Sequence, residues 1–496
     1  MRPPIRSSFA RPAFAAALAL CPLLAATTAS ASGFSTARFG GEHGNPMTSN
    51  PTSVYYNPGA IAMSQGVNLF LDGTVAFRSV TYDRVPDAGA PGEVPEPADG
   101  VGANTGTASL FNVAGAPMLG ATAQYDVRED LSLGGGLAFF VPFGGSAVWD
   151  KNENFEGNPN YPGPVDGTQR YYTIDGSLRT MYLSAAVSVA YKRFVSLGLS
   201  GGLALSSIDS LRARQLSGNT DLNLEGRAWY KGKGTHPQLG AGVLVTPLDD
   251  ADKLRIGLSY QAQPNFGRLS LNGLLQIYQA GNLSGETPGE DDVELHQSLP
   301  DVIRAGVSAR PTKEMELRLF GDFTRWSVFD DQCFAQAGEP CEVEENGKPT
   351  AGSTVAVNLP RRWNDAFGVR AGMSYWVREP VELFVGVGYD GSAVPDDTLE
   401  PSLVDFHDVS TGIGARAQLM DRLGVELSYT QIFYVPRDTT GLSRNPTFDG
   451  PSNSPDSGGV YQQSIGVLNV SLHGSFDPFA KEPATAARSA SLLGAL

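Results

Sequence analysis

Residues 381–390 read VELFVGVGYD, and apolar side chains occupy every second position. Five of them, from Val381 to Tyr389, alternate with positions that include glutamate, glycine and aspartate. Segments 423–429 (LGVELSY), 254–261 and 408–419 repeat the pattern. Successive side chains of a strand point to opposite faces, so each segment has one apolar face and one polar or glycine face. The alternation therefore predicts an all-β chain.

The connections between these strands alternate in length. Six are short turns, at 128–130, 192–193, 247–252, 311–313, 378–380 and 421–422. Seven are longer and rich in proline, glycine and aspartate, at roughly 85–106, 150–169, 212–226, 269–297, 329–361, 393–406 and 436–460. Short turns on one side and long loops on the other are typical of outer-membrane barrels. Six and seven connections separate fourteen strands, which predicts a transmembrane antiparallel β-barrel of about 14 strands.

A soluble β-sandwich also alternates and is the main alternative fold. The strands here are about 10–18 residues long, against the usual ~5–6, and the loops lengthen on one side only. The last strand, 465–476, ends in Phe476 and is similar to the aromatic-ended strand that bacterial barrel assembly machinery reads, although twenty residues follow it. A fourteen-stranded barrel has a lumen too wide for wall side chains to fill. The lumen is therefore expected to hold water or a plug.

The N-terminal leader indicates the cellular compartment, and the net charge limits the possible partners. Residues 1–31 have the pattern of a signal peptide, with Arg2, Arg6 and Arg11 before an apolar run and a small-residue cleavage site at 29–31. The 496 residues carry a formal net charge of −16 and no basic cluster, which argues against nucleic acid as a partner. We expect a monomer in the bacterial outer membrane, in contact with lipid and lipopolysaccharide and assembled by the barrel machinery.

The segment after the leader does not alternate. Residues 44–62 read GNPMTSNPTSVYYNPGAIA, and three Asn-Pro pairs favour turns over a helix or strand. Irregular backbone is not tolerated against lipid but is allowed inside a barrel. The predicted organisation is a signal peptide at 1–31, a hatch folded into the lumen at 32–65, a barrel at 66–476, and a flexible tail at 477–496.

Several stretches together resemble one family. They are SGFSTARF (32–39), Asn57-Pro58-Gly59 followed by AIA, LPDVIRAGVSARPTKEMELRLFGDFTRWSVFD (299–330), and WNDAFGVRAGMSYWV, VGVGYDGSAVPD and DRLGVELSYTQIFY within 363–434. The mature chain resembles the FadL/TodX family of outer-membrane transporters of long-chain fatty acids and aromatic hydrocarbons. Its hatch motif usually has alanine where Gly59 stands.

The resemblance implies a fourteen-stranded barrel with an N-terminal hatch and passive transport of a hydrophobic small molecule. Phe34 and Phe39 match aromatic positions at the family's N-terminus and are expected to bind the ligand; ordinary packing of plug on wall is the alternative. The ligand would leave sideways at a kink in the third strand, LSLGGGLAFFVPFGGSAVW (131–149). Gly134, Gly135, Gly136 and Pro142 are expected to break its ladder; relief of crowding at a bend is the alternative.

Other chemistry is weakly supported. Cys333 and Cys341 are expected to form a disulfide in an oxidising compartment, with a redox or metal pair as the less favoured possibility. The G-x-S-x-G match at 198–202 lies in mid-strand, where no nucleophile elbow forms. The five histidines are scattered. We therefore expect no catalytic residue, no metal and no cofactor.

Two further points concern the cargo and the function. A fatty-acid carboxylate would need a cation in the pocket, and Arg361, Arg362 and Arg370 are candidates by position, with charge pairing across the lumen as the alternative. A non-selective porin and a structural or adhesive surface protein are the competing functions. The sequence does not distinguish fatty acids, alkanes and aromatics as cargo.

Overall fold

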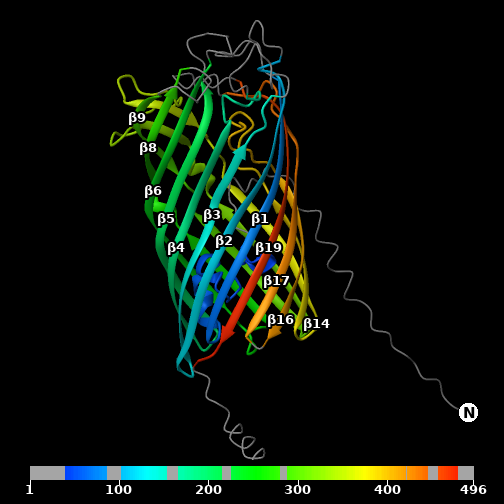
Figure 1. The fold of residues 1–496 in the computed structure, drawn as a ribbon. Coiled ribbons are helices and arrows are strands. Elements are labelled where there is room, and N and C mark those ends of the chain that lie inside the picture. Colours follow the sequence, from blue (N-terminus) through cyan, green and yellow to red (C-terminus); the bar gives the residue numbers. More distant parts are fainter. Residues whose placement is uncertain are drawn as a thin grey trace, which may run out of the picture.

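The computed structural model describes residues 39–85, 102–152, 166–214, 225–279, 288–420, 422–444 and 456–478. The expected signal peptide (1–31) and nearly all of the expected tail (477–496) lie outside these ranges. Strands dominate the described residues (Figure 1). Among the described helices, none is long and apolar enough to cross a lipid bilayer.

Fourteen antiparallel strands form a closed barrel, as the alternation predicted. β1 pairs with β19 along its whole length, from Val67↔Phe476 to Arg84↔Gly459, and this pairing closes the ring. In order around the wall the strands are β1 (Val67–Arg84), β2 (Gly106–Arg128), β3 (Leu131–Val148), β4 (Asp175–Tyr191), β5 (Val195–Arg214), β6 (Gly226–Val245), β7 (Leu254–Gln261), β10 (Val302–Thr312), β11 (Met315–Thr324), β14 (Ala366–Arg378), β15 (Val381–Asp390), β16 (Asp408–Met420), β17 (Leu423–Tyr434) and β19 (Gly459–Phe476).

The side chains of the wall are arranged with apolar residues outside and polar residues inside. Leu383 and Val387 of β15 are 49% and 57% exposed on the outer face, whereas Glu382 on the inner face is 3% exposed. A soluble protein would bury the leucine and expose the glutamate. The reversed pattern suits a wall that meets lipid outside and a packed polar interior inside.

Four strands extend one side of the wall beyond the membrane part. They are β8 (Arg268–Tyr278), β9 (Gly289–Ser298), β12 (Asp331–Gln336) and β13 (Val355–Pro360). β6 carries the extension, because Gly240–Val245 pair with β7 while Arg227–Lys233 pair with β8. The expectation that 269–297 and 329–361 are loops is therefore wrong for these strands. Polar residues interrupt the alternation of apolar side chains in these strands, even though Leu271 of β8 and Leu295 of β9 are fully buried.

The remaining short elements lie inside the barrel or at its rim. Three belong to the hatch, within residues 39–65: η1 (Gly41–His43), α1 (Ser53–Tyr56) and η2 (Pro58–Met63). Figure 1 shows them, in dark blue, inside the lower half of the cylinder. η4 (Pro264–Phe266), η5 (Trp326–Val328) and the two-residue β18 (Arg437–Asp438) lie between wall strands. The described part of the segment expected to be a hatch thus occupies the lumen.

Candidate functional site

Asn57 ties the hatch to the wall. Its side-chain nitrogen donates to the carbonyl oxygens of Pro46 (2.7 Å) and of Val243 on β6 (2.9 Å). Its side-chain oxygen accepts from the Gly59 backbone nitrogen at 3.0 Å and caps η2, with Pro58 as the first helical residue. The Asn57-Pro58-Gly59 motif therefore starts a helix and joins it to β6 at the same point.

Glycines on the inner wall make room for this attachment. A β-carbon at Gly59 would lie 2.6 Å from the Gly242 carbonyl oxygen, and one at Gly198 of β5 would lie 2.4 Å from the Pro58 carbonyl carbon. Real β-carbons do not approach backbone so closely, so the contact requires glycine on both sides. Gly198 belongs to the G-x-S-x-G match, whose Ser200 lies within β5. We define the contact of η2 with β5 and β6 as the glycine seat.

Gly134–Gly136 do not break the ladder of β3, and this expectation is wrong. Gly135 is in register with Ala123 of β2 and with Val187 of β4. A β-carbon at Gly134 would lie 2.7 Å from the Ala62 backbone nitrogen. A β-carbon at Gly136 would lie 3.0 Å from a methyl group of Val54, also in the hatch. These two glycines accommodate the hatch, and the ladder beside them is intact.

The backbone hydrogen-bond ladder between β2 and β3 stops beyond Leu119 and Phe139. Its register runs from Arg128↔Leu131 to Leu119↔Phe139, and backbone contact resumes where the Asp150 nitrogen donates to the Ser109 carbonyl at 2.9 Å. Between these points, within the described strands, residues 110–118 of β2 are in register with β1 alone.

Pro142 lies beside this interval, on β3. The register of β3 with β4 shifts between Phe140 and Phe143, the residues that flank Val141 and Pro142. Proline cannot donate to a ladder, which suits it to such a shift. We call the interval between residues 110–118 of β2 and β3 the wall gap.

A cavity of about 740 Å³ lies between the hatch and the long-loop side of the barrel. Gly44, Pro46 and Tyr55 of the hatch border it from below. Gly115 of β2 and Gly145 of β3 border it on either side of the wall gap. Its further lining includes apolar side chains of wall strands, of the extension and of the segment between β15 and β16: Val141, Leu178, Leu275, Phe334, Leu359 and Leu403. The cavity therefore reaches both the extension and the wall gap.

Phe39 lies at the inner end of the wall gap. Its side chain is fully buried, with its ring centroid 5.8 Å from those of Phe140 on β3 and Tyr55 in the hatch. Phe140 in turn packs against Tyr182 of β4 at 5.5 Å. The other aromatic candidate, Phe34, lies outside the described residues.

The arginines suggested by sequence position are occupied by other partners. Arg361 forms an ion pair with Glu400 (2.6 Å), and Arg362 donates to a backbone carbonyl. Arg370 is held between Asp322 (2.8 Å) and Asp390 (2.6 Å). Charge pairing, the alternative reading, is what the structure shows for Arg361 and Arg370.

Five other arginines border the cavity (Arg78, Arg179, Arg212, Arg214 and Arg304), and sequence reasoning missed them; two of them have informative contacts. Arg304 of β10 is 7% exposed and stacks over the Tyr55 ring with its guanidinium carbon 4.3 Å from the centroid. Arg78 of β1 donates to the side chain of Gln463 (2.8 Å) and to the Ser146 carbonyl beside the wall gap (3.3 Å). In the described ranges neither arginine forms an ion pair with a carboxylate. The period-two alternation of β1 and β10 places both arginines on inner faces, so the sequence contains a signal that could have identified them.

Two remaining expectations concern sulfur and metal. The structure places a disulfide between Cys333 of β12 and Cys341, with a Cα–Cα distance of 6.1 Å. It lies in the extension, remote in sequence from the hatch. Among the residues that the structure describes, no group of three or more His, Cys, Asp or Glu side chains is arranged to hold a metal ion.

Comparisons with known proteins agree with this architecture. A family model described as outer membrane protein transport protein (OMPP1/FadL/TodX) matches residues 10–445. No curated protein matches the chain. A crystal structure of a Pseudomonas aeruginosa FadL homologue is similar with a TM-score of 0.68 and 18% identity, covering 91% of this chain and 100% of that one.

Two solved toluene transporters are similar to a lesser degree. TbuX from Ralstonia pickettii has a TM-score of 0.54 and 13% identity, covering 90% of this chain and 99% of that one. TodX from Pseudomonas putida has a TM-score of 0.54 and 15% identity, covering 90% of this chain and 98% of that one. At these identities the structural likeness shows the fold alone.

Proposed function

The chain belongs to the OMPP1/FadL/TodX family of outer membrane transport proteins, and from this premise we propose that it takes up hydrophobic small molecules passively. The cargo class is long-chain fatty acids or hydrocarbons. One observation carries the proposal: a partly apolar cavity, floored by the hatch, reaches an interval where the wall loses its ladder.

The route follows from the borders of the cavity. A ligand enters from the long-loop side, where Leu275 and Phe334 of the extension offer apolar surface. It passes to the floor of the cavity at Tyr55 of the hatch, behind which the buried ring of Phe39 packs. It leaves sideways between Gly115 and Gly145, through the wall gap, into the membrane.

Burial of apolar surface supplies the affinity. Each methylene group moved from water to the cavity contributes about 0.8 kcal/mol, so an acyl chain is retained without directional contacts. Arg78 and Arg304 add positive charge beside this apolar surface, which suits a carboxylate head group. A hydrocarbon would use the apolar lining alone.

The hatch argues against the competing porin function. Asn57 and the glycine seat hold η2 against β5 and β6 with contacts too close for a continuous water channel at that point. A protein of this kind is expected to show no large steady current in planar bilayers. A steady open current in the unmodified protein would contradict the proposal.

A matched pair of variants tests the sideways exit. Gly145 borders the cavity, and a β-carbon there meets no atom within 4 Å, so Gly145→Phe introduces a ring at the wall gap without a clash at its β-carbon. Gly135→Phe adds the same ring on the same strand where the ladder is intact. We expect Gly145→Phe to slow uptake of labelled oleate and toluene by cells, and Gly135→Phe to leave it unchanged. Equal uptake by both variants would contradict exit through the wall gap.

A further inference from the structure

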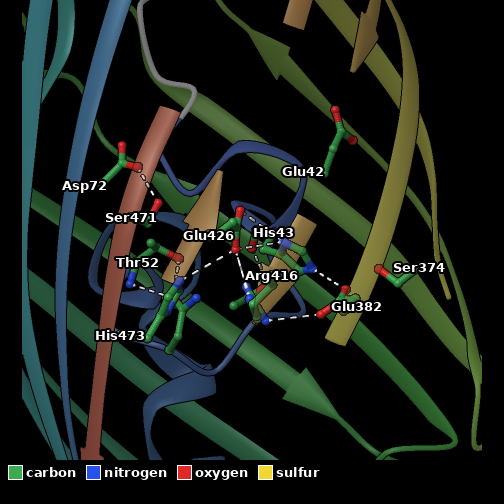
Figure 2. Close-up of polar contacts among 12 residues, drawn as sticks. Glu42, His43, Thr52, Asp72, Ser374, Glu382, Arg416, Glu426, Ser471 and His473 are labelled. Atoms are coloured by element: carbon green, nitrogen blue, oxygen red, sulfur yellow. Dashed lines mark hydrogen bonds and ion pairs between the residues drawn. The ribbon is translucent and has the colours of Figure 1, made fainter. Parts of the chain in front are cut away.

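The hatch is attached to the wall at a second place, opposite the glycine seat. His43 of η1 lies between two buried glutamates on neighbouring parts of the wall, as Figure 2 shows. Its Nε2 is 2.8 Å from a carboxylate oxygen of Glu382 on β15, and its Nδ1 is 3.3 Å from one of Glu426 on β17. A carboxylate only accepts, so both contacts are hydrogen bonds when the imidazole ring carries two protons. We call this arrangement the His43 clamp.

Other charged groups surround the clamp from several strands. Arg416 of β16 is 2.7 Å from Glu426 and 3.7 Å from Glu382, and His473 of β19 is 3.6 Å from Glu426. The Phe384 ring of β15 packs edge-on against His43 at 4.7 Å. More distant charges that act on these groups are Asp72 of β1 and Glu316 of β11. Glu42, next to His43 in the hatch, is drawn apart from the clamp in Figure 2.

The charges within the clamp balance. Glu382 and Glu426 are 3% and 0% exposed at their side chains, so their two negative charges are removed from water. Protonated His43 and Arg416 supply two positive charges. Removing one member of a buried charged group leaves its partner uncompensated, which is costly. His43 is the member that the hatch contributes.

A tight turn connects the clamp to Phe39. Gly40 and Gly41 have φ of 69° and 51°, a left-handed conformation that favours glycine, and the His43 nitrogen donates to the Gly40 carbonyl at 2.9 Å. A β-carbon at Gly44 would lie 2.0 Å from the Phe39 carbonyl oxygen, so residues 39–44 fold closely upon themselves. Where His43 is fixed, Phe39 is fixed as well.

We propose that His43 is a positioning residue for transport: the clamp holds the turn at 39–44 so that Phe39 stays against Phe140 at the inner end of the wall gap. Release of His43 frees this turn while η2 remains on the glycine seat. The hatch then has a fixed base and one movable segment. The effect on uptake rests on the proposed function; the mechanical role of the clamp does not.

The cavity lining supports an indirect role. The turn contributes Gly41, Glu42 and Gly44 to the described border of the cavity, but neither His43 nor Phe39, whose ring packs behind Tyr55. His43 therefore acts through the position of the turn and of Phe39. His43 holds the hatch in place and does not contact the ligand.

Hydrogen exchange in the full-length protein in detergent tests the clamp directly. In His43→Ala we expect backbone amides of 39–44 to exchange about 100-fold faster, because a buried charged group has lost one partner. Amides of 59–63, on the glycine seat, should keep the wild-type rate. His43→Lys returns a positive charge and should restore most of the protection. The matched control is His236→Ala, which removes another buried histidine, one that accepts from the Ser270 nitrogen of β8.

A second variant covers the case in which His43→Ala does not assemble. Glu382→Gln keeps the shape of the side chain and removes one charge of the clamp, and it should also accelerate exchange at 39–44. Unchanged exchange at 39–44 in the assembled variants would overturn the inference. Equal acceleration at 59–63 would also overturn it, because the hatch would then loosen as one body. Faster exchange at 39–44 with unaltered oleate uptake would support the clamp and count against the proposed sideways exit.

Discussion

Replacing Asn57 with alanine is expected to release η2 from the wall. The change removes two donated hydrogen bonds, to Pro46 and Val243, and the cap on the Gly59 nitrogen. Each buried group left without its partner costs about 1–3 kcal/mol, so three groups cost roughly 3 kcal/mol at the lower bound. Since 1.4 kcal/mol corresponds to a factor of ten, local opening of η2 becomes at least about 100-fold more populated.

Amide exchange of residues 59–63 in detergent measures this opening directly. Asn68→Ala is the control, because Asn68 donates to a backbone carbonyl in an exposed position near the start of β1. Asn57→Asp separates the contribution of the helix cap from that of the two donated hydrogen bonds. Its carboxylate still accepts from the Gly59 nitrogen but cannot donate to Pro46 or Val243. If the amides of 59–63 exchange at the wild-type rate in Asn57→Ala, the glycine contacts alone hold the hatch and the role given to Asn57 is wrong.

Four other changes have defined outcomes. Gly198→Ala places a β-carbon against the carbonyl of Pro58 and should displace η2, seen as faster proteolysis of the hatch, whereas Gly135→Ala should not. Phe39→Ala removes the ring that packs behind Tyr55 at the cavity floor and should weaken retention of oleate by ~1–3 kcal/mol, measured as a lower affinity in detergent; equal affinity would remove Phe39 from the ligand site. Arg304→Gln should lower the affinity for oleate and leave that for toluene unchanged, and a parallel loss for both would show that the charge serves folding. Burial and Arg416 act to lower the pKa of His43, but the two glutamates outweigh them and raise the pKa above its usual value near 6.5. The clamp is therefore fully formed below pH 6.5 and weakens as the pH rises through the raised pKa. Amide exchange at 39–44, corrected for its intrinsic pH dependence, should accelerate on the alkaline side only in protein that retains His43.

The wall could be predicted from the sequence because its signal is local. Alternation with period two follows directly from the backbone of a strand, so segments such as 381–390 showed both their structure and their two faces. The turn and loop lengths then gave the number of strands. β8 and β9 were missed because they lie in the extension, where polar residues such as Glu290 and Asp292 interrupt the same alternation.

The site was harder to predict because it depends on contacts between residues far apart in the chain. His43 meets Glu382 across 339 positions and Glu426 across 383, and no spacing rule joins them. The glycines of the inner wall were visible as a pattern, but their purpose depends on the hatch backbone that lies against them. From sequence alone Gly134 and Gly136 therefore indicate a break in the ladder, whereas in the structure they make room for Ala62 and Val54.

The position of the wall gap has its own physical reason. Backbone groups in a membrane need partners, and a wall strand without a neighbour on one side is tolerated only where protein or a cavity covers it. Residues 110–118 of β2 meet this condition, because the cavity lies behind them and Gly115 borders it. Side chains replace part of the missing ladder: Asn112 (2.8 Å) and Arg78 (3.3 Å) both donate to the Ser146 carbonyl of β3. An interruption of the ladder can therefore persist at this level of the barrel, and under the proposed function the cavity that makes it tolerable would also bring a ligand to it.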